Sequence, residues 1–572
     1  MNKEEPHLSE SGIAESSRRA FILRTAVVAT GLPLSIGCDN KNHTMPGRGD
    51  FPLLEFSLQS DKEYADPFWQ VEVDVVVVSP DGKKLCIPAF WSGDKAWRWR
   101  FAAAQAGKYS YRTIASDSEN AGLHGVEGEF EVEAYAGDNE LFKKGALSIS
   151  QNKRYLETAD GDPFLWLGDT WWMALTERLR WPQDFKKLTA DRIEKGFNVV
   201  QLVAGLYPDM DSFDPRGKNE AGFPWTADYA AIHPEWWDLA DRRIGHLVDA
   251  GLMPCILACW GYYLKKMGMK KMKAHWRYVI ARWGAYPVVW CLAGEGSMPW
   301  YLSKQKKEEK AELEKGWTEL ARYVRKTDPW QRLITMHPSR SSREVVRDPA
   351  VLDFDMLQTG HGDYRSIANT LKSIDAAVKV EPIMPVLQSE VCYEGIMAGS
   401  RQDIQRFMFW SSLLNGCCGF TYGANGIWQV NEKGKPFGAS PHGRNWGNTP
   451  WQQAMAFAGS QQLGVGAEIL RSLPWEKMVP HPEWVSPRWN KANYHQPSAA
   501  GVVNEFRIIY TPSLWSPPKL TLLEQGISYK AKLINPSTGE AFALKGVTAD
   551  AKGEYHPAIF PEQRDWVIVL TR

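Results

Sequence analysis

The sequence has no excess of charge of either sign, and it has few cysteines for its length. Its 572 residues include 67 Lys and Arg, 67 Asp and Glu, and 8 Cys. Proteins that bind nucleic acid or an anionic membrane through their overall charge carry a basic excess, so we expect neither partner. The length fits two to four domains, and a hydrophobic share of 44% is sufficient for buried cores.

Motifs of several enzyme classes are also absent. No Gly-rich phosphate loop follows an expected strand, no H-E-x-x-H pair or close His and Asp cluster suggests a metal, and no Gly-x-Ser-x-Gly element suggests a serine hydrolase. Most cysteines lie inside apolar runs, where we expect small buried side chains and not zinc ligands or disulfides. We therefore expect no metal and no cofactor, and the cysteines leave the redox compartment open.

Residues 1–46 predict an export signal and linker. The segment Ser17–Ile22 contains two adjacent arginines and resembles a twin-arginine signal, and a short apolar stretch follows it. This stretch ends at Gly37 and Cys38, which resembles a bacterial lipoprotein processing site with lipidation at Cys38. No other stretch is long and apolar enough to span a bilayer. We expect an exported periplasmic or cell-envelope lipoprotein whose only membrane contact is the anchor at Cys38; a disordered polar tail is the alternative.

Two regions of alternating residues predict β-sandwich domains. In AWRWRF, Trp97, Trp99 and Phe101 face one way and the arginines face the other, and turn residues separate further runs of this kind. We expect one sandwich over residues 50–135. The runs EFRIIY and DWVIVL near the C-terminus alternate in the same way and predict a second sandwich over residues 466–572.

The region between them, residues 145–465, alternates apolar runs with helical stretches. Fully apolar strands that alternate with helices indicate a parallel sheet covered on both faces. Eight such units predict an α/β fold, a (β/α)8 TIM barrel. A doubly wound open sheet is the structural alternative, weakened by the absence of a phosphate loop. The expected strands are 164–169, 198–203, 253–258, 288–295, 332–337, 354–359, 384–390 and 419–423.

Two glutamates end strands of the expected barrel. Glu295 closes the fourth strand and Glu390 the seventh, and reactive groups of barrel enzymes come from such positions. A charged group in an apolar setting is costly unless it is paired or functional. Hydrolysis of a glycosidic bond needs two carboxyl groups that flank the anomeric carbon, so we predict Glu295 and Glu390 as the catalytic pair. Buried salt bridges to Arg, or exposed loop positions, are the alternatives.

Other residues near the same ends are candidate substrate-binding residues. The chain has 27 Trp, and Trp can stack on a sugar ring while its N–H bonds a hydroxyl. Core packing is the alternative for each Trp, a helix cap or loop position for Asp169, and a purely structural position for His361. The candidates are Asp169, Trp171, Trp172, Gln201, Trp260, His361, Tyr422 and Asn425.

Four stretches of the expected barrel are characteristic when taken together: FLWLGDTWWMALTERL, FNVVQLV, the strand that ends in Glu295, and LQSEVCYEG around Glu390. They resemble the apiosidase-like glycoside hydrolases, bacterial barrel enzymes of which some act on pectic side chains. The region with DPFW and AWRWRF is similar to the family's N-terminal β-domain. The region from RSLPWEKMVP to DWVIVL is similar to a C-terminal β-domain that carries the historical label of collagen binding, to which we attach no function. The matches cover about residues 50–572.

The resemblance implies an acid/base at Glu295 and a nucleophile at Glu390. It also leads us to expect Asp at the first position, where this chain has Gly294-Glu295. One methylene moves the carboxyl group by roughly 1.5 Å, so we expect a substrate other than the one in the family's name. We predict a retaining hydrolase of a plant or algal polysaccharide-derived glycan. The alternatives are a glycan-binding protein on a degenerate barrel and, less favoured, a polysaccharide lyase.

Overall fold

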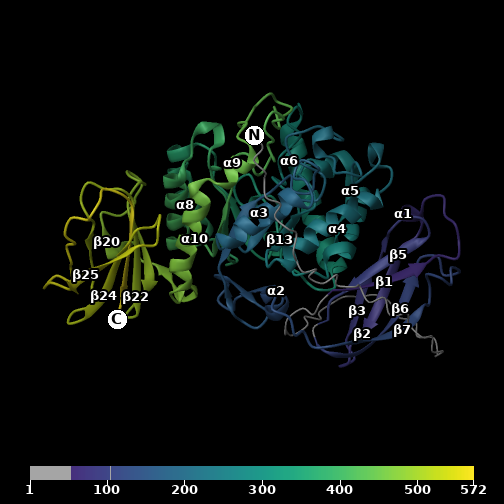
Figure 1. Ribbon diagram of the computed structural model, residues 1–572, viewed down its shortest axis with the longest axis horizontal. Coiled ribbons are helices and arrows are strands. Elements are labelled where there is room, and N and C mark those ends of the chain that lie inside the picture. Colours follow the sequence, from purple (N-terminus) through teal and green to yellow (C-terminus); the bar gives the residue numbers. More distant parts are fainter. Residues whose placement is uncertain (1–52, 104) are drawn as a thin grey trace, which may run out of the picture.

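The computed structural model describes residues 53–103 and 105–572, and the chain forms three parts in a row (Figure 1). A β-domain drawn in purple precedes a central barrel, and a β-domain drawn in yellow follows it at the opposite side. The expected signal and linker, residues 1–46 with the twin-arginine segment and Cys38, lie entirely outside the described residues.

The N-terminal domain consists of two antiparallel sheets, ordered β1-β5-β4 and β3-β2-β6-β7. Trp97, Trp99 and Phe101 are each at most 1% exposed and pack between the sheets, as the alternation predicts. The strands are β1 (Leu54–Gln59), β2 (Val73–Val78), β3 (Lys84–Pro88), β4 (Phe90–Trp91), β5 (Ala96–Phe101), β6 (Gly107–Ala115) and β7 (Glu127–Val132), with the short helix α1 (Pro67–Gln70) between the first two.

The central region is a nearly closed barrel, so the expected (β/α)8 fold is confirmed. Eight parallel strands follow the order β15-β14-β13-β12-β11-β18-β17-β16. Between β15 and β16, Asp353 completes the ring, because its N–H donates to the Ile334 carbonyl over 2.8 Å and its carboxylate accepts from the Ile334 N–H over 2.6 Å. The strands are β11 (Trp166–Thr170), β12 (Val199–Val203), β13 (Met253–Leu257), β14 (Val289–Cys291), β15 (Ile334–Thr335), β16 (Asp355–Gln358), β17 (Val386–Glu390) and β18 (Gly419–Tyr422).

Helices cover the outside of the barrel (Figure 1). In α4, Trp236, Ala240 and Ile244 are fully buried at the spacing of one helical face, and Pro234 occupies the first turn, where its missing N–H costs nothing. The helices are α3 (Gln183–Glu194), α4 (Pro234–Asp249), α5 (Tyr263–Trp283), α6 (Lys306–Thr327), α7 (Ile367–Ala377), α8 (Gln402–Leu414), α9 (Trp451–Met455) and α10 (Ala458–Arg471). Before the barrel lie α2 (Glu140–Lys144) and a small sheet of β8 (Leu147–Ile149), β9 (Leu156–Thr158) and β10 (Pro163–Phe164).

The C-terminal domain is an unequal sandwich. A six-stranded antiparallel sheet, β19-β21-β22-β26-β24-β25, packs against the two-stranded sheet β20-β23 around Trp484, Leu520 and Ile568. The expected boundary at 466 falls inside α10, which packs against α8 of the barrel. The strands are β19 (Val479–Pro480), β20 (Val485–Ser486), β21 (Ser498–Val502), β22 (Phe506–Thr511), β23 (Lys519–Leu520), β24 (Ser528–Ile534), β25 (Ala541–Thr548) and β26 (Trp566–Thr571).

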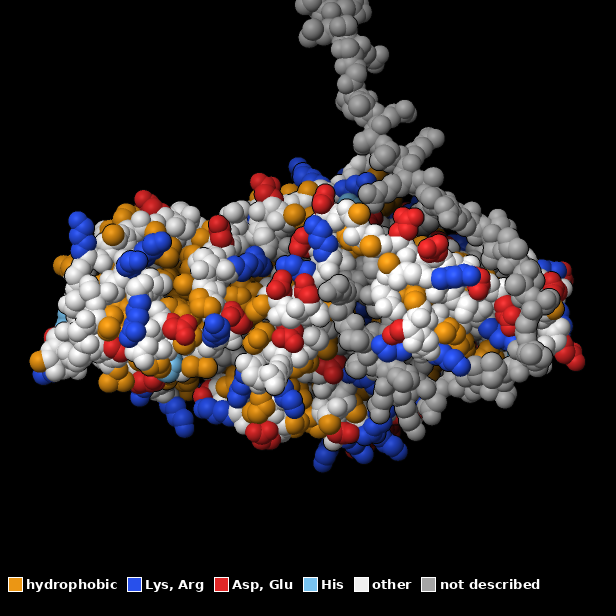
Figure 2. Space-filling view, turned by 90° about the horizontal axis from the view of Figure 1, so that it is seen from below, with side chains coloured by type: hydrophobic (Ala, Val, Ile, Leu, Met, Phe, Trp, Pro, Cys, Tyr) orange, Lys and Arg blue, Asp and Glu red, His pale blue; other side chains and the backbone are white. Residues whose placement is uncertain are grey.

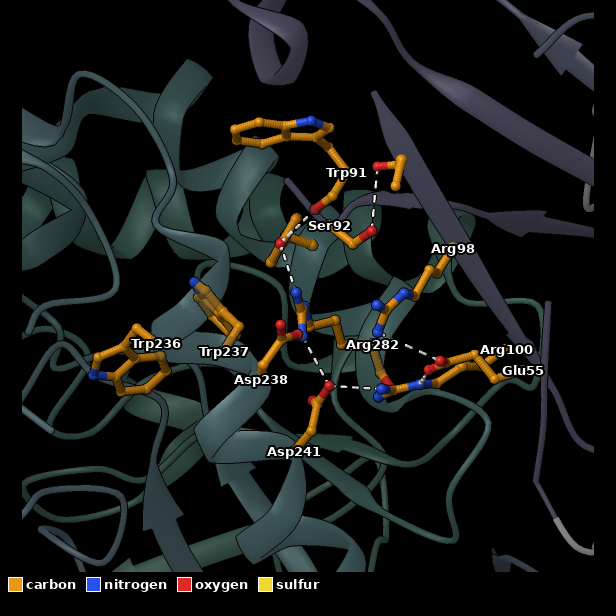
Figure 3. Close-up of polar contacts among 12 residues, drawn as sticks. Glu55, Trp91, Ser92, Arg98, Arg100, Trp236, Trp237, Asp238, Asp241 and Arg282 are labelled. Carbon is orange, nitrogen blue, oxygen red and sulfur yellow. Dashed lines mark hydrogen bonds and ion pairs between the residues drawn. The ribbon is translucent and has the colours of Figure 1, made fainter. Parts of the chain in front are cut away.

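Buried charges join the N-terminal domain to the barrel. Arg100 of β5 donates to Asp241 of α4 over 2.6 Å, and Arg282 of α5 donates to the same carboxylate over 2.8 Å. Figure 3 shows both guanidinium groups directed at Asp241. Arg100 also donates to Glu55 over 2.9 Å, and Arg282 to Asp238 over 2.8 Å. The Arg100–Asp241 pair crosses from the N-terminal domain to the barrel, and breaking a buried pair of this kind is costly, so it stabilises the observed orientation of the two domains.

The surface agrees with the neutral charge balance. On the face shown in Figure 2, acidic and basic side chains are interspersed, and neither sign dominates. Among the helices of residues 53–103 and 105–572, none combines the length and apolar content needed to cross a membrane.

Candidate active site

A cavity of about 270 Å³ lies where the carboxyl ends of the barrel strands meet. Five of the residues singled out in the sequence line it: Trp172, Trp260, Glu295, His361 and Glu390. The barrel thus brings both candidate catalytic glutamates into one space, as their positions on opposite strands predict.

Glu295 follows β14 in a strained backbone conformation. Its φ is 44°, in the left-handed region that non-glycine residues rarely adopt. The preceding residue must be glycine, because a Cβ at Gly294 would lie 2.1 Å from the ring of Trp260. The close packing of Trp260 on Gly294 thus accounts for the glycine before Glu295, and backbone strain like that of Glu295 concentrates at functional sites.

The surroundings of Glu295 favour its protonated form. Burial, followed by the nearby carboxyl groups of Glu390 and Asp209, raises the pKa of Glu295 to about 7. Gln358 donates a hydrogen bond of 3.2 Å to Oε1 and partly offsets this shift. Glu295 can therefore hold a proton near neutral pH.

Glu390 ends β17 and is held in its ionised form. His361 Nε2 lies 3.0 Å from Oε1, His337 Nε2 lies 3.3 Å from Oε2, and the Tyr393 hydroxyl donates to Oε2 over 2.5 Å. Burial opposes the charge of Glu390, but the contacts with His337 and His361 outweigh it and lower its pKa to about 2. Burial lowers the pKa of His361 in turn, whereas Glu390 raises it, and the net shift is upward.

Tyr393 is positioned by a second glycine. A Cβ at Gly423, directly after β18, would lie 1.9 Å from the Tyr393 ring. The indole N–H of Trp172 donates to the Tyr393 hydroxyl over 3.0 Å. A chain of hydrogen bonds therefore runs from Trp172 through Tyr393 to the Glu390 carboxylate.

Five other candidates lie outside the cavity, and four of their side chains have partners elsewhere. Asp169 is fully buried and accepts from Arg192 over 2.6 Å and from the Trp171 indole over 2.7 Å. These contacts make Asp169 and Trp171 part of the packing between β11 and α3, which corrects their expected sugar contacts. Gln201 donates to the Ser389 carbonyl over 3.1 Å and Tyr422 to Glu394 over 2.6 Å. Asn425 is fully buried and does not line the cavity either.

Several residues that line the cavity were not predicted from the sequence. Gln358 and Tyr393 lie at or just after the ends of expected strands, so the rule that selected Glu390 could have found them. Asp209, His442 and Trp446 also line the cavity, but they lie on long loops whose paths the sequence pattern does not predict.

Within residues 53–103 and 105–572, one group of three side chains is spaced to bind an ion: Asp550, Glu554 and His556, at the surface of the C-terminal domain. Glu554 there is already paired with Lys519 over 2.7 Å. This group lies on a different domain from the cavity and shares no residue with it.

Fold and site together define a class, the (β/α)8-barrel proteins with carboxyl groups in a cavity at the strand ends. Three solved structures share the fold. A protein described as a glycoside hydrolase has 21% identity and a TM-score of 0.61, covering 75% of this chain and 97% of its own. A glycoside hydrolase family 5 protein of Bacteroides vulgatus has 22% identity and a TM-score of 0.60, covering 75% and 94%. A candidate glycoside hydrolase of the same organism has 16% identity and a TM-score of 0.66, covering 91% and 98%.

The family follows from the sequence match. Residues 150–477 match the apiosidase-like catalytic domain, and residues 49–116 match DUF5060, a domain of unknown function. The chain belongs to the apiosidase-like family, which is glycoside hydrolase-like, so the resemblance stated above is confirmed. No curated protein matches the chain.

Proposed function

We propose that the protein is a retaining glycoside hydrolase with Glu390 as nucleophile and Glu295 as acid/base. The observation that carries this proposal is that both carboxyl groups line one cavity but have different surroundings. Glu390 contacts His337, His361 and Tyr393, which favour its ionised form, whereas burial and the nearby carboxyl groups raise the pKa of Glu295 to about 7. Two carboxyl groups whose pKa values are pushed apart divide into an acid and a nucleophile.

The reaction has two steps. Glu390 attacks the anomeric carbon while the Glu295 proton passes to the departing oxygen, which breaks the glycosidic bond and leaves the sugar esterified to Glu390. Glu295, now ionised, removes a proton from water, and the water oxygen displaces Glu390. The second step returns the proton to Glu295 and the negative charge to Glu390, so both carboxyl groups end in their starting states.

The proposed substrate is a glycan derived from a plant or algal polysaccharide, such as a pectic side chain. Support comes from the aromatic lining, which includes Trp172, Trp260, Trp428 and Trp446, since indole rings stack on the apolar faces of sugars. A screen of pectic and other oligosaccharides, read by released monosaccharides, tests hydrolysis. NMR of the first anomer released tests retention, and initial release of the opposite anomer would contradict the mechanism.

The same screen separates the two alternatives. A glycan-binding protein would bind an oligosaccharide but release no sugar from it at any enzyme concentration. A lyase would yield an unsaturated product that absorbs in the ultraviolet. A uronate lyase also needs a cation to neutralise the substrate carboxylate, and of the described residues that line the cavity none is Lys or Arg.

We also propose export and a lipid anchor at Cys38, on the twin-arginine and Gly37-Cys38 patterns alone. Metabolic labelling with a palmitate analogue, followed by cell fractionation, tests this in a bacterial host. Label lost in Cys38→Ser and a membrane fraction that becomes soluble would support the anchor, whereas unlabelled wild-type protein would contradict it.

A further inference from the structure

The cavity contains a third carboxyl group that the proposed reaction does not use. Asp209 lies on the loop between β12 and α4, is 8% exposed, and lines the cavity together with Glu295 and Glu390. Burying a carboxylate costs free energy unless a partner donates hydrogen bonds to it or balances its negative charge. Burial raises the pKa of Asp209, and hydrogen bonds from Tyr301, Ser440 and Trp446, with the charge of His442, offset this shift only in part. A ligand that supplies further donors would therefore stabilise the Asp209 carboxylate.

Three loops hold Asp209 in place. Its φ is 55°, and its N–H donates to the Tyr301 hydroxyl over 3.1 Å. Tyr301 in turn stacks on His442, with ring centroids 5.0 Å apart and planes at 12°. Tyr301 follows β14 and His442 follows β18, so loops from three parts of the barrel converge on this carboxyl group. A strained residue fixed in this way is a built feature of the site.

The charges of the cavity select against an anionic ligand. Asp209, Glu295 and Glu390 contribute carboxyl groups, and among the described lining residues the only side chains that can become cationic are His361 and His442. His361 is already engaged with Glu390 at 3.0 Å. A sugar carboxylate would therefore enter beside carboxylates with no Arg or Lys to pair with it, which is unfavourable in a buried site.

We propose that Asp209 is a specificity-determining residue that accepts hydrogen bonds from hydroxyl groups of an uncharged sugar and disfavours uronates. This inference rests on the proposed glycosidase function and names the substrate class for the same site. A carboxylate offers two oxygens, which suits a pair of neighbouring hydroxyls, and charge-assisted hydrogen bonds are about twice as strong as neutral ones. A neutral sugar supplies further donors to the Asp209 carboxylate without adding a charge.

The kinetic test compares Asp209→Asn with Asp211→Asn, an exposed carboxylate on the same loop that does not line the cavity. The probes are 4-nitrophenyl glycosides of neutral pentoses and hexoses, together with the glucuronide and galacturonide. We expect wild-type protein to cleave a neutral glycoside and neither uronide. Asp209→Asn should raise KM about 10- to 100-fold, the loss of a hydrogen bond to a charged group, and Asp211→Asn should leave KM unchanged.

A pH profile separates a direct role from general damage. Glu295 faces Glu390, Asp209, His361, Tyr301 and Tyr393. Removing the Asp209 charge lowers the pKa of Glu295, so the alkaline limb of kcat/KM should move to lower pH in Asp209→Asn alone. Unchanged KM and limb in this variant, or cleavage of a uronide at a rate similar to that of the neutral glycoside, would overturn the proposal.

A binding measurement tests the role of Asp209 without requiring the protein to cleave a substrate. Calorimetry measures the affinity of neutral and uronic oligosaccharides for Glu390→Gln and for the double variant Glu390→Gln/Asp209→Asn. If the double variant binds neutral oligosaccharides about 10-fold or more weakly than Glu390→Gln, the role of Asp209 is supported. This conclusion holds even if the wild type cleaves no probe, a result that would reject only the proposed hydrolysis. Equal affinities in the two variants would reject the role of Asp209, whether or not the wild type is a hydrolase.

Discussion

Tyr393 donates a hydrogen bond of 2.5 Å to Oε2 of Glu390, three residues before it in the sequence. The Tyr393 hydroxyl also accepts a hydrogen bond from the Trp172 indole N–H, so its own proton is directed at the Glu390 carboxylate. Tyr393 thus orients the carboxylate and stabilises its charge, and attack by Glu390 must begin from this arrangement.

Tyr393→Phe should lower kcat/KM by about 10- to 100-fold, the effect of losing a hydrogen bond to a charged group. It should also lower the melting temperature, because the Trp172 N–H loses its acceptor in a buried site. Tyr364→Phe is the control, since Tyr364 is half exposed and contacts Asp403 outside the cavity. Steady-state kinetics and calorimetry measure both effects, and equal kinetics in the two variants would speak against an orienting role.

The motif Ser389–Gly395 contains two buried glutamates with different expected roles. Glu390 faces the cavity, whereas Glu394 accepts from Tyr422 over 2.6 Å and from the Gly459 N–H over 3.1 Å. Glu390→Gln should abolish turnover while the protein stays folded and binds glycan. Glu394→Gln should lower the melting temperature and leave kcat within a few-fold of wild type. Full activity in Glu390→Gln would refute the assignment of the nucleophile.

The alkaline limb of the pH profile should report Glu295. An acid must be protonated to act, so kcat/KM should fall as pH rises through about 7, the pKa to which burial and its carboxyl neighbours raise Glu295. Glu390, with a pKa of about 2, remains ionised over this range and does not set the limb. In Glu295→Gln the limb should vanish and kcat/KM should fall about 10²- to 10⁴-fold. A limb that persists at the same pH in Glu295→Gln would assign it to another group.

We expect the Asp241 carboxylate to stabilise the interface between the N-terminal domain and the barrel. Asp241→Asn leaves the buried cations Arg100 and Arg282 undercompensated, which costs about 3–5 kcal/mol when a buried pair is broken. Asp238→Asn is the matched control on the same helix, because that side chain is 39% exposed and such a pair contributes about 0–1 kcal/mol. Differential scanning calorimetry compares the two, and equal shifts in melting temperature would argue against a buried network.

The barrel could be predicted because its strands are buried on both faces and appear in the sequence as apolar runs. All eight expected runs overlap β11 to β18. Glu295 and Glu390 followed from strand ends alone. Asp169 met the same rule, yet it pairs with Arg192, which lies 23 residues away on α3, and no pattern in the sequence reveals that partner. Asp209 and His442 depend on loop paths, which are set by tertiary packing and not by periodicity.

The contact between Gly423 and the ring of Tyr393 has an evolutionary consequence. Any side chain at position 423 would occupy the space of the ring, and the ring carries the hydroxyl that meets Glu390. The two positions are therefore coupled: a descendant sequence can replace the glycine only after the tyrosine has become smaller, and that first change already weakens the nucleophile. Gly423 should persist wherever the tyrosine persists, although Gly423 itself does not line the cavity.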